Sequence, residues 1–167
     1  AQDNFLFNTS IKENIKMGNP NASDDEIIEA AKAASCHNFI MELENGYDTK
    51  VGDAGGALSG GERQRITIAR AMLKQAKVII LDEATAFADP ENEYLIQSAI
   101  NNLIKGKTLI VVAHRLSTIT NADTILFMKD GEIVENGTHD NLVKKDGVYA
   151  SLWKNYVGGL DDEKEAI

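Results

Sequence analysis

Two short apolar runs, each followed by polar residues, constrain the fold of this chain more than any other feature. The runs "VIIL" and "LIVVA" cover residues 78–81 and 109–113, and a helix-forming segment that starts at Pro90 separates them. Continuous apolar strands that alternate with helices are typical of a parallel sheet covered by helices on both faces. We therefore predict an α/β core.

The rest of the chain supplies helix and turn patterns around this core. Thr9 or Ser10 is placed to cap a short helix, and Ser23 with Glu26 forms a capping-box pattern before a second one. Because the residues up to about 57 show these helical patterns, we predict a helical region there. Further predictions are helices over 61–75, 90–104, 139–145 and 148–157, and a hairpin over 124–137 that turns at 130–131.

Composition excludes several classes of protein. The net charge of -9 over 167 residues argues against generic binding to nucleic acid, because no broad basic surface is available. Cys36 is the only cysteine, so no disulfide forms within the chain, and we expect it to be a small buried apolar residue. The apolar runs are too short to span a membrane, and no secretory signal is visible.

Polar residues follow both predicted strands at the edge where ligands bind in open α/β sheets. Asp82 and Glu83 follow the first strand, and His114 follows the second. Carboxylate oxygens suit Mg²⁺, and a second carboxylate is able to orient a water as general base. The alternative is structural: the acidic pair caps the next helix, and His114 is a packing histidine.

A second candidate site precedes a helix. Ser59, Gly60 and Gly61 lie at the predicted start of the segment "ERQRITIARAML". Unpaired N–H groups at a helix N-terminus favour anions, and glycines let a phosphate approach the backbone. The alternative is an ordinary serine cap followed by two flexible glycines.

Three segments together, in this order and spacing, carry a resemblance to a known family. They are "LSGGERQRITIARAML", "VIILDEAT" and "VVAHRLSTI". The chain resembles, over essentially its whole length, the nucleotide-binding domain of the ATP-binding cassette (ABC) family. The resemblance implies an α/β P-loop NTPase (RecA-like) parallel-sheet core with a helical signature subdomain, and ATP and Mg²⁺ as ligands.

The resemblance also implies roles for individual residues. Ser59, Gly60 and Gly61 are similar to the signature loop, which binds the γ-phosphate of an ATP held by the opposite subunit. Asp82 resembles the Walker B aspartate, which holds Mg²⁺ through water, and Glu83 resembles the catalytic glutamate that polarises the attacking water.

Three further positions match family motifs. Gln2 resembles the Q-loop glutamine, which senses Mg²⁺ and the γ-phosphate and faces the membrane domains. Asp89 matches the aspartate of the D-loop at the dimer contact. His114 matches the switch histidine, which contacts the γ-phosphate.

The chain also departs from the family pattern. The phosphate-cradling loop that ends in Gly-Lys-Ser/Thr is absent, and in the family it precedes the Q-loop. We therefore expect a core that is incomplete at its N-terminus and an isolated chain that binds ATP weakly. Ala86 replaces the usual serine or asparagine of the D-loop, and Asp53 stands where the family has a glutamate.

These patterns predict three regions. The Q-loop and the helical subdomain with the signature occupy 1–75, the C-terminal part of the ATPase core occupies 76–158, and an acidic flexible tail occupies 159–167. In an intact parent protein, we expect two such domains to sandwich two ATP molecules.

The leading hypothesis is the ATPase of an ABC transporter that powers export, or siderophore uptake by an exporter-type fold. Its expected partners are a second nucleotide-binding domain and the coupling helices of a transmembrane domain, at the cytoplasmic face of the cell membrane. The alternatives are a non-transport ABC ATPase of DNA repair or chromosome structure, and an inactive truncated dimerisation module.

Overall fold

The computed structural model describes the backbone of residues 5–51, 58–82, 90–113 and 116–165, with side chains except those of 90–91 and 159–165. The chain divides into two compact units, Ala1–Ile110 (unit 1) and Val111–Ile167 (unit 2).

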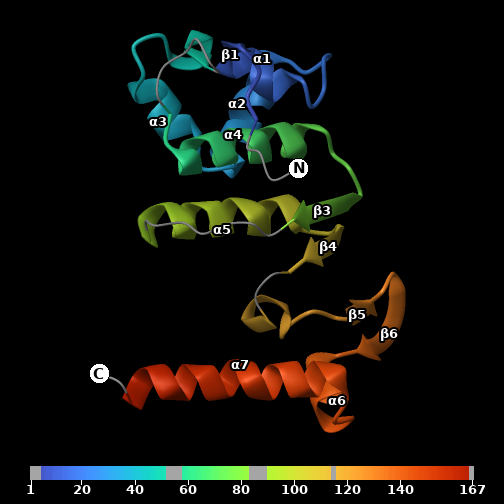
Figure 1. Cartoon of the computed structure of the whole chain (residues 1–167). Helices are drawn as coiled ribbons and strands as arrows, with labels where there is room; N and C mark the ends of the chain where they lie inside the picture. Colours follow the sequence, from blue (N-terminus) through green and yellow to red (C-terminus); the bar gives the residue numbers. More distant parts are fainter. Residues whose placement is uncertain (1–4, 52–57, 83–89, 114–115, 166–167) are drawn as a thin grey trace. The chain divides into compact units, whose positions relative to one another are not determined.

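In its described residues, unit 1 is a helical assembly with three short strands and the start of a fourth. Its elements are β1 (Thr9–Ser10), α1 (Ile11–Lys16), α2 (Asp24–Ala33), α3 (His37–Glu42), η1 (Gly46–Asp48), β2 (Lys50–Val51), α4 (Gly60–Leu73), β3 (Val78–Asp82), α5 (Pro90–Ile104) and the first residues of β4 (Thr108–Val112). Helix α4 contacts α1, α2 and α5, which makes it the central helix of the unit (Figure 1). The strands β1 and β2 pair antiparallel.

The first helices begin where the sequence predicts. Ser10 caps α1 by accepting a hydrogen bond from the N–H of Glu13, and Ser23 with Glu26 forms a complete capping box at α2. Both capping predictions are therefore confirmed, with Ser10 rather than Thr9 as the cap of α1.

The core of unit 1 is built from aliphatic residues on the facing sides of these helices. Cys36 belongs to this core: it is fully buried, and its Sγ donates to the carbonyl of Ala31 at 3.3 Å. Burial raises the pKa of the Cys36 thiol to about 12, so the thiol stays protonated and unreactive near neutral pH. The other members are Leu6, Ile11, Ile15, Ala22, Ile27, Ala30, Ala31, Ala34, Ile40, Val51, Leu58, Ile66, Ile68, Ala69, Leu73, Ile79, Ile96, Ala99 and Leu103.

The strands β3 and β4 form the predicted parallel pair, with α5 as the connection between them. The N–H of Thr108 donates to the carbonyl of Lys77 at 3.0 Å, which joins the two strands at their beginnings. The sequence predicts that helices cover both faces of these strands, but within the described residues one face of β3 is exposed. Ile79 is 8% exposed, whereas Val78 and Ile80 are 51% and 69% exposed. Alternate strand residues point to opposite faces, and only one of these faces packs into the core of unit 1.

Unit 2 contains the predicted hairpin and the two C-terminal helices. Its elements are the end of β4, η2 (Leu116–Ile119), β5 (Ile125–Lys129), β6 (Glu132–Gly137), α6 (His139–Lys144) and α7 (Val148–Glu165). Asp130 and Gly131 have φ values of 52° and 83°, as a two-residue hairpin turn of type I′ requires, so the predicted turn is confirmed. The backbone of α7 is helical to Glu165, within the segment predicted as an acidic tail.

Candidate functional site

The N-terminus of α4 is the best-defined part of the predicted site. The Oγ of Ser59 accepts a hydrogen bond from the N–H of Glu62 at 3.2 Å, and a carboxylate oxygen of Glu62 accepts from the N–H of Ser59 at 2.7 Å. This capping box satisfies two of the amide groups that a helix start leaves unpaired. The amides of Gly60 and Gly61 have no hydrogen-bond partner among the described residues.

The two glycines of this site have different surroundings. A Cβ atom at Gly60 would meet nothing within 4 Å, and Gly60 is exposed. A Cβ atom at Gly61 would lie 2.9 Å from the Cγ and Oδ1 of Asn92 on α5. Gly60 therefore leaves the helix start accessible from outside, whereas Gly61 lets α5 pack closely against α4.

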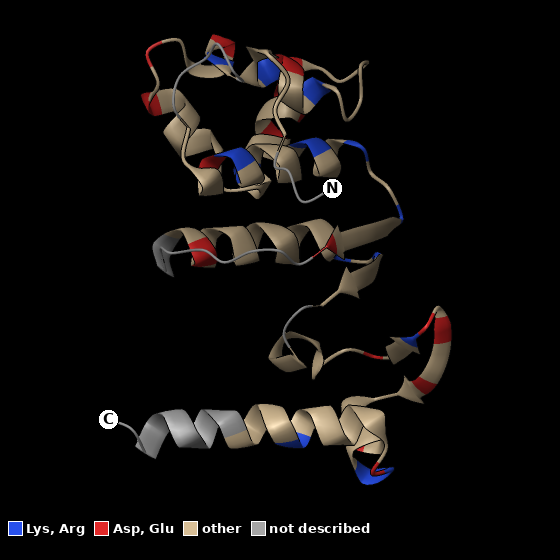
Figure 2. Ribbon diagram, in the orientation of Figure 1, with Lys and Arg blue, Asp and Glu red and all other residues tan. Residues whose placement is uncertain are grey.

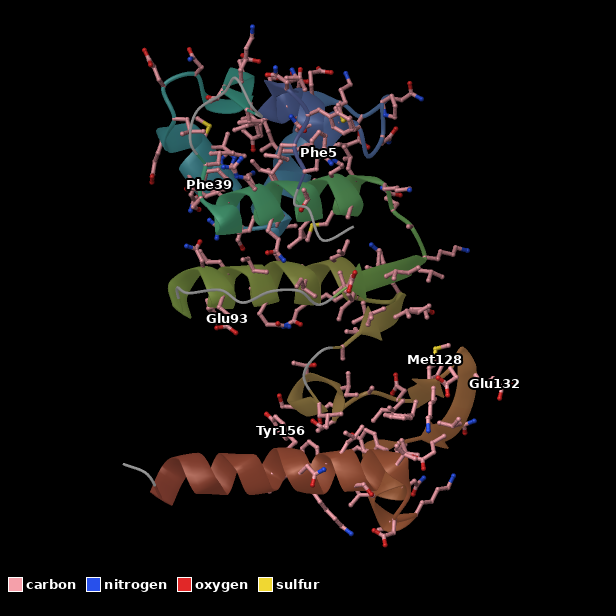
Figure 3. All side chains as sticks on the ribbon, in the orientation of Figure 1. Phe5, Phe39, Glu93, Met128, Glu132 and Tyr156 are labelled. Carbon is pink, nitrogen blue, oxygen red and sulfur yellow. The ribbon has the colours of Figure 1, made fainter. Side chains whose placement is uncertain are left out.

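A buried arginine lies one turn behind the glycines. Arg65 is only 4% exposed, and its Nη1 donates to the Oδ1 of Asn92 at 2.6 Å. Its guanidinium also lies over the ring of Phe39, 5.3 Å from the centroid, near the start of α4 (Figure 3). Arg65 and Asn92 therefore hold the first turns of α4 against α5 and α3.

The electrostatics of α4 suit an anion at its N-terminus. Glu62 is the only acidic residue of the helix, and its carboxylate is engaged in the capping box. Arg63, Arg65 and Arg70 give the helix a basic character, visible as blue segments in Figure 2. The helix dipole and the unpaired amides add a positive field at the same end. The arrangement is therefore able to bind a phosphate oxygen through backbone N–H groups and the Ser59 hydroxyl.

Asp82 lies on a different element, at the last position of β3. Its side chain is exposed at the carboxyl end of the strand, where the sequence predicts a ligand. No group of three or more His, Cys, Asp or Glu side chains able to hold a metal ion occurs among the described residues. A single exposed carboxylate still fits Mg²⁺, which is commonly bound by one or two carboxylates together with substrate phosphates.

Four of the predicted site residues lie outside the described residues: Gln2, Glu83, Asp89 and His114. Asp53 and Ala86, the two departures from the family pattern, also lie outside them. Their assignments stay predictions. The structure thus brings Ser59, Gly60 and Gly61 together at one helix start and places Asp82 at the end of β3.

Several residues of structural importance to this site were missed by the sequence analysis. They are Arg65 and Asn92 at the first turns of α4, and Arg70 and Asn14 at its other end. Arg65 follows Gly61 by four residues, and Arg70 follows Ile66 by four, so both arginines lie on the helix face that carries buried residues. A charged residue at such a position is a signal that sequence inspection is able to find.

Comparison with known proteins places the chain in a family. A family model described as ABC transporter matches residues 1–86, which is 86 of the 167 residues. A putative multidrug export ATP-binding/permease protein of Staphylococcus aureus (strain NCTC 8325 / PS 47) is 53% identical over 152 residues, covering 91% of this chain and 26% of that protein. A protein of the same description from the bovine strain RF122 / ET3-1 is 52% identical over the same length.

A solved structure supports the same assignment. The structure of a bacterial Atm1-family ABC exporter with ATP bound matches this chain with a TM-score of 0.77 and 44% identity, covering 90% of this chain and 26% of that one. The chain therefore spans about a quarter of the length of these relatives, 26% in both comparisons. The likeness confirms the predicted α/β P-loop NTPase fold class.

One structural finding bears on membranes: within the described part of the chain, no helix is both long and apolar enough to cross a bilayer. Three observations agree on the family of this chain. They are the signature sequence at the start of α4, the βαβ unit whose first strand ends in Asp82, and the family match over more than half of the chain. The chain belongs to the ABC transporter family.

Proposed function

We propose that this chain is part of the ATP-binding and ATP-hydrolysing domain of an ABC transporter. The observation that carries the proposal is the start of α4, where a capping box fixes the helix, Gly60 is exposed, and the amides of Gly60 and Gly61 have no hydrogen-bond partner among the described residues. At this helix start, Ser59, Gly60 and Gly61 bind the γ-phosphate of an ATP held by a second nucleotide-binding domain. Each ATP-binding site is then complete only when two nucleotide-binding domains form a dimer.

The remaining roles follow the family motifs. Asp82 holds Mg²⁺ through water, and the ion, when bound, offsets negative charge on the phosphates. Glu83 orients the attacking water as general base, and His114 contacts the γ-phosphate. Gln2 senses the same phosphate, and Asp89 lies at the contact between the two domains. Hydrolysis then depends mostly on positioning and electrostatics.

The proposed cellular role is transport. The relatives are named multidrug export ATP-binding/permease proteins, which favours a parent chain that carries its own transmembrane domain. We propose that this domain works at the cytoplasmic face of the membrane and moves coupling helices when the ATP sandwich closes. This similarity to named exporters favours transport over the roles in DNA repair or chromosome structure that the sequence leaves open.

The decisive experiment uses Glu83→Gln in the full-length parent protein. The variant loses the general base, so we expect phosphate release to fall by at least about hundredfold while ATP-bound dimers accumulate. Phosphate release and size-exclusion chromatography with MgATP measure the two effects. The control is Glu93→Gln, because Glu93 is an exposed glutamate on α5 (Figure 3). We expect this variant to keep wild-type turnover. Wild-type hydrolysis by Glu83→Gln would remove Glu83 from its proposed role.

A further inference from the structure

A second arginine of α4 makes contacts that the proposed function does not use. The guanidinium of Arg70 donates from Nε to the carbonyl of Asn14 at 2.8 Å and from Nη2 to the Oδ1 of Asn14 at 2.8 Å. A third bond runs from Nη1 to the carbonyl of Phe5 at 3.3 Å. The same guanidinium lies 5.6 Å from the ring centroid of Phe7. Arg70 therefore holds the chain around residues 5–7 against α4.

Asn14 completes this contact from the other side. It is fully buried, and its Nδ2 donates to the carbonyls of Phe7 and Ser10, both at 3.0 Å. Its Oδ1 also accepts from the N–H of Phe7 at 2.9 Å. Both donors and both acceptor positions of the amide are thus used, which makes the network fully satisfied.

The backbone approaches α4 closely at the same point. A Cβ atom at Gly18, just after α1, would collide with the carbonyl oxygen of Arg70 and lie 3.2 Å from the Cβ of Leu73. Alanine is therefore excluded from this position without a shift of α1. The contact between α1 and α4 is fixed by backbone proximity as well as by hydrogen bonds.

The chemistry of Arg70 indicates a positioning role. Among the described residues no carboxylate pairs with Arg70, and its partners are carbonyl and amide oxygens. Arg70 is half-buried, and even partial burial of a cation without a counter-charge costs free energy that an apolar side chain would avoid. A planar fork with several N–H donors is, however, well suited to fix backbone carbonyls in one orientation.

We propose that Arg70 and Asn14 are positioning residues that make the segment 5–10 and helix α4 move as one rigid unit. Ser59 precedes Arg70 by eleven residues on the same helix, a separation of roughly 16 Å. Phosphate binding at Ser59 is thereby coupled to the position of Phe5 and Phe7, which are 58% and 46% exposed and stack edge-to-face at 5.0 Å. The proposal rests on the proposed function, because it needs a ligand at Ser59. The coupling is reciprocal, so a contact made by Phe5 and Phe7 also alters affinity at Ser59.

The test is hydrogen exchange measured by mass spectrometry on the full-length parent protein. Wild type, Arg70→Met and Arg70→Lys are compared with and without the Mg²⁺ complex of the β,γ-imido analogue of ATP. Lys74→Met is the matched control, since Lys74 is an exposed cation four residues after Arg70, at the C-cap of α4. Segments 59–63 and 5–10 are followed as separate peptides.

The first expected result needs no nucleotide. In Arg70→Met the amides of segment 5–10 exchange about tenfold faster than in wild type, because the charged hydrogen bonds that fix it are lost. The Lys74→Met variant exchanges like wild type. Unchanged exchange of 5–10 in Arg70→Met would overturn the proposal at this step.

The second expected result concerns coupling. The nucleotide slows exchange at both 59–63 and 5–10 in wild type, but only at 59–63 in Arg70→Met. Arg70→Lys keeps the charge and the aliphatic stem but not the planar fork, so we expect it to lose part of the nucleotide protection of 5–10. It replaces Arg70→Met as the test variant if Arg70→Met fails to fold. A general loss of stability would not separate the two peptides in this way.

Three results would contradict these expectations, and each would overturn a different part of the argument. Equal nucleotide protection of 5–10 in wild type and both Arg70 variants would overturn the positioning role. Protection of 59–63 without any change at 5–10 in wild type would overturn the coupling and leave the proposed function intact. Absence of protection at 59–63 in wild type would contradict the proposed function itself, and the coupling with it.

Discussion

The helices α2 and α4 begin with the same local motif but present different N-termini. Ser23 accepts from the N–H of Glu26 at 3.3 Å, and Ser59 accepts from the N–H of Glu62 at 3.2 Å. Each glutamate accepts in return from the amide of its serine, at 2.8 Å in α2 and 2.7 Å in α4. The two capping boxes are therefore equivalent as helix starts.

The residues that follow the two serines differ in charge. In α2, Asp24 and Asp25 put carboxylates into the first turn, and Asp24 pairs with Lys12 at 2.7 Å. In α4 the same positions are Gly60 and Gly61, which carry no side chain. Carboxylates in the first turn complement the helix dipole and repel an external anion.

The serine hydroxyls differ as well. The Oγ of Ser23 donates to a carboxylate oxygen of Glu26 at 3.1 Å. The hydroxyl of Ser59 has no acceptor among the described residues, so its hydrogen is available to a ligand. The comparison teaches that a capping box fixes where a helix begins, whereas the next two residues decide whether that start is filled by the protein or left for an anion.

The largest expected effect comes from making α4 resemble α2. Gly60→Asp puts a carboxylate into the first turn of α4, at an exposed position where a Cβ atom meets nothing within 4 Å. We expect the melting temperature to stay unchanged and the affinity for MgATP in the full-length dimer to fall by about hundredfold, through repulsion between like charges. The ATP concentration that gives half-maximal hydrolysis and dimer formation measures the effect.

The matched control for this change is Asp24→Gly, which makes the first turn of α2 resemble α4. We expect the ATP dependence of this variant to equal that of wild type, because the proposed phosphate site lies at the start of α4 and not at α2. Wild-type ATP dependence in Gly60→Asp would show that the start of α4 does not face the phosphate.

A smaller effect separates the two glycines. Gly61→Ala places a Cβ atom 2.9 Å from the side chain of Asn92, so we expect a loss of stability of about 1–3 kcal/mol from overpacking. Gly60→Ala meets no neighbour, so we expect a change within about 0.5 kcal/mol. Thermal unfolding of the full-length protein compares the two variants.

A double variant sharpens this prediction. In an Asn92→Ala background the two nearest neighbours of the new Cβ atom, the Cγ and Oδ1 of Asn92, are removed and only its Cβ remains, at 3.1 Å, so Gly61→Ala should cost less stability than in wild type. Equal costs in both backgrounds would mean that Asn92 is not the reason for a glycine at position 61.

The smallest expected effect concerns the two serines. Ser59→Ala and Ser23→Ala each remove a helix cap, so each should cost ~1 kcal/mol of stability. Only Ser59→Ala should also weaken ATP binding, by about fivefold, through loss of one hydrogen bond to phosphate. Melting temperature and ATP-dependent dimer formation are measured on both. An equal loss of ATP affinity in Ser23→Ala would break the distinction between the two helix starts.

Much of the local structure was predictable from the sequence. The capping box of Ser23 and Glu26, the turn at 130–131 and the burial of Cys36 all follow the predictions, since each pattern spans only a few residues. The apolar run of β3 by itself predicts cover on both faces, which does not hold for the described residues; the exposed face agrees with the expectation of an incomplete core. An apolar strand specifies that its faces are suited to burial, but other segments must supply the atoms that bury them.

The sequence by itself determined the family, the helix starts and the position of the signature residues at the N-terminus of α4. These depend on contiguous motifs and on hydrogen bonds between residues three positions apart, such as Ser59 and Glu62. Only the tertiary structure decided that Gly60 is accessible while Gly61 packs on Asn92, and that Arg70 fixes the carbonyl of Phe5. The physical reason is distance along the chain: Arg65 and Asn92 are 27 residues apart and Arg70 and Phe5 are 65 apart, so folding alone brings them together.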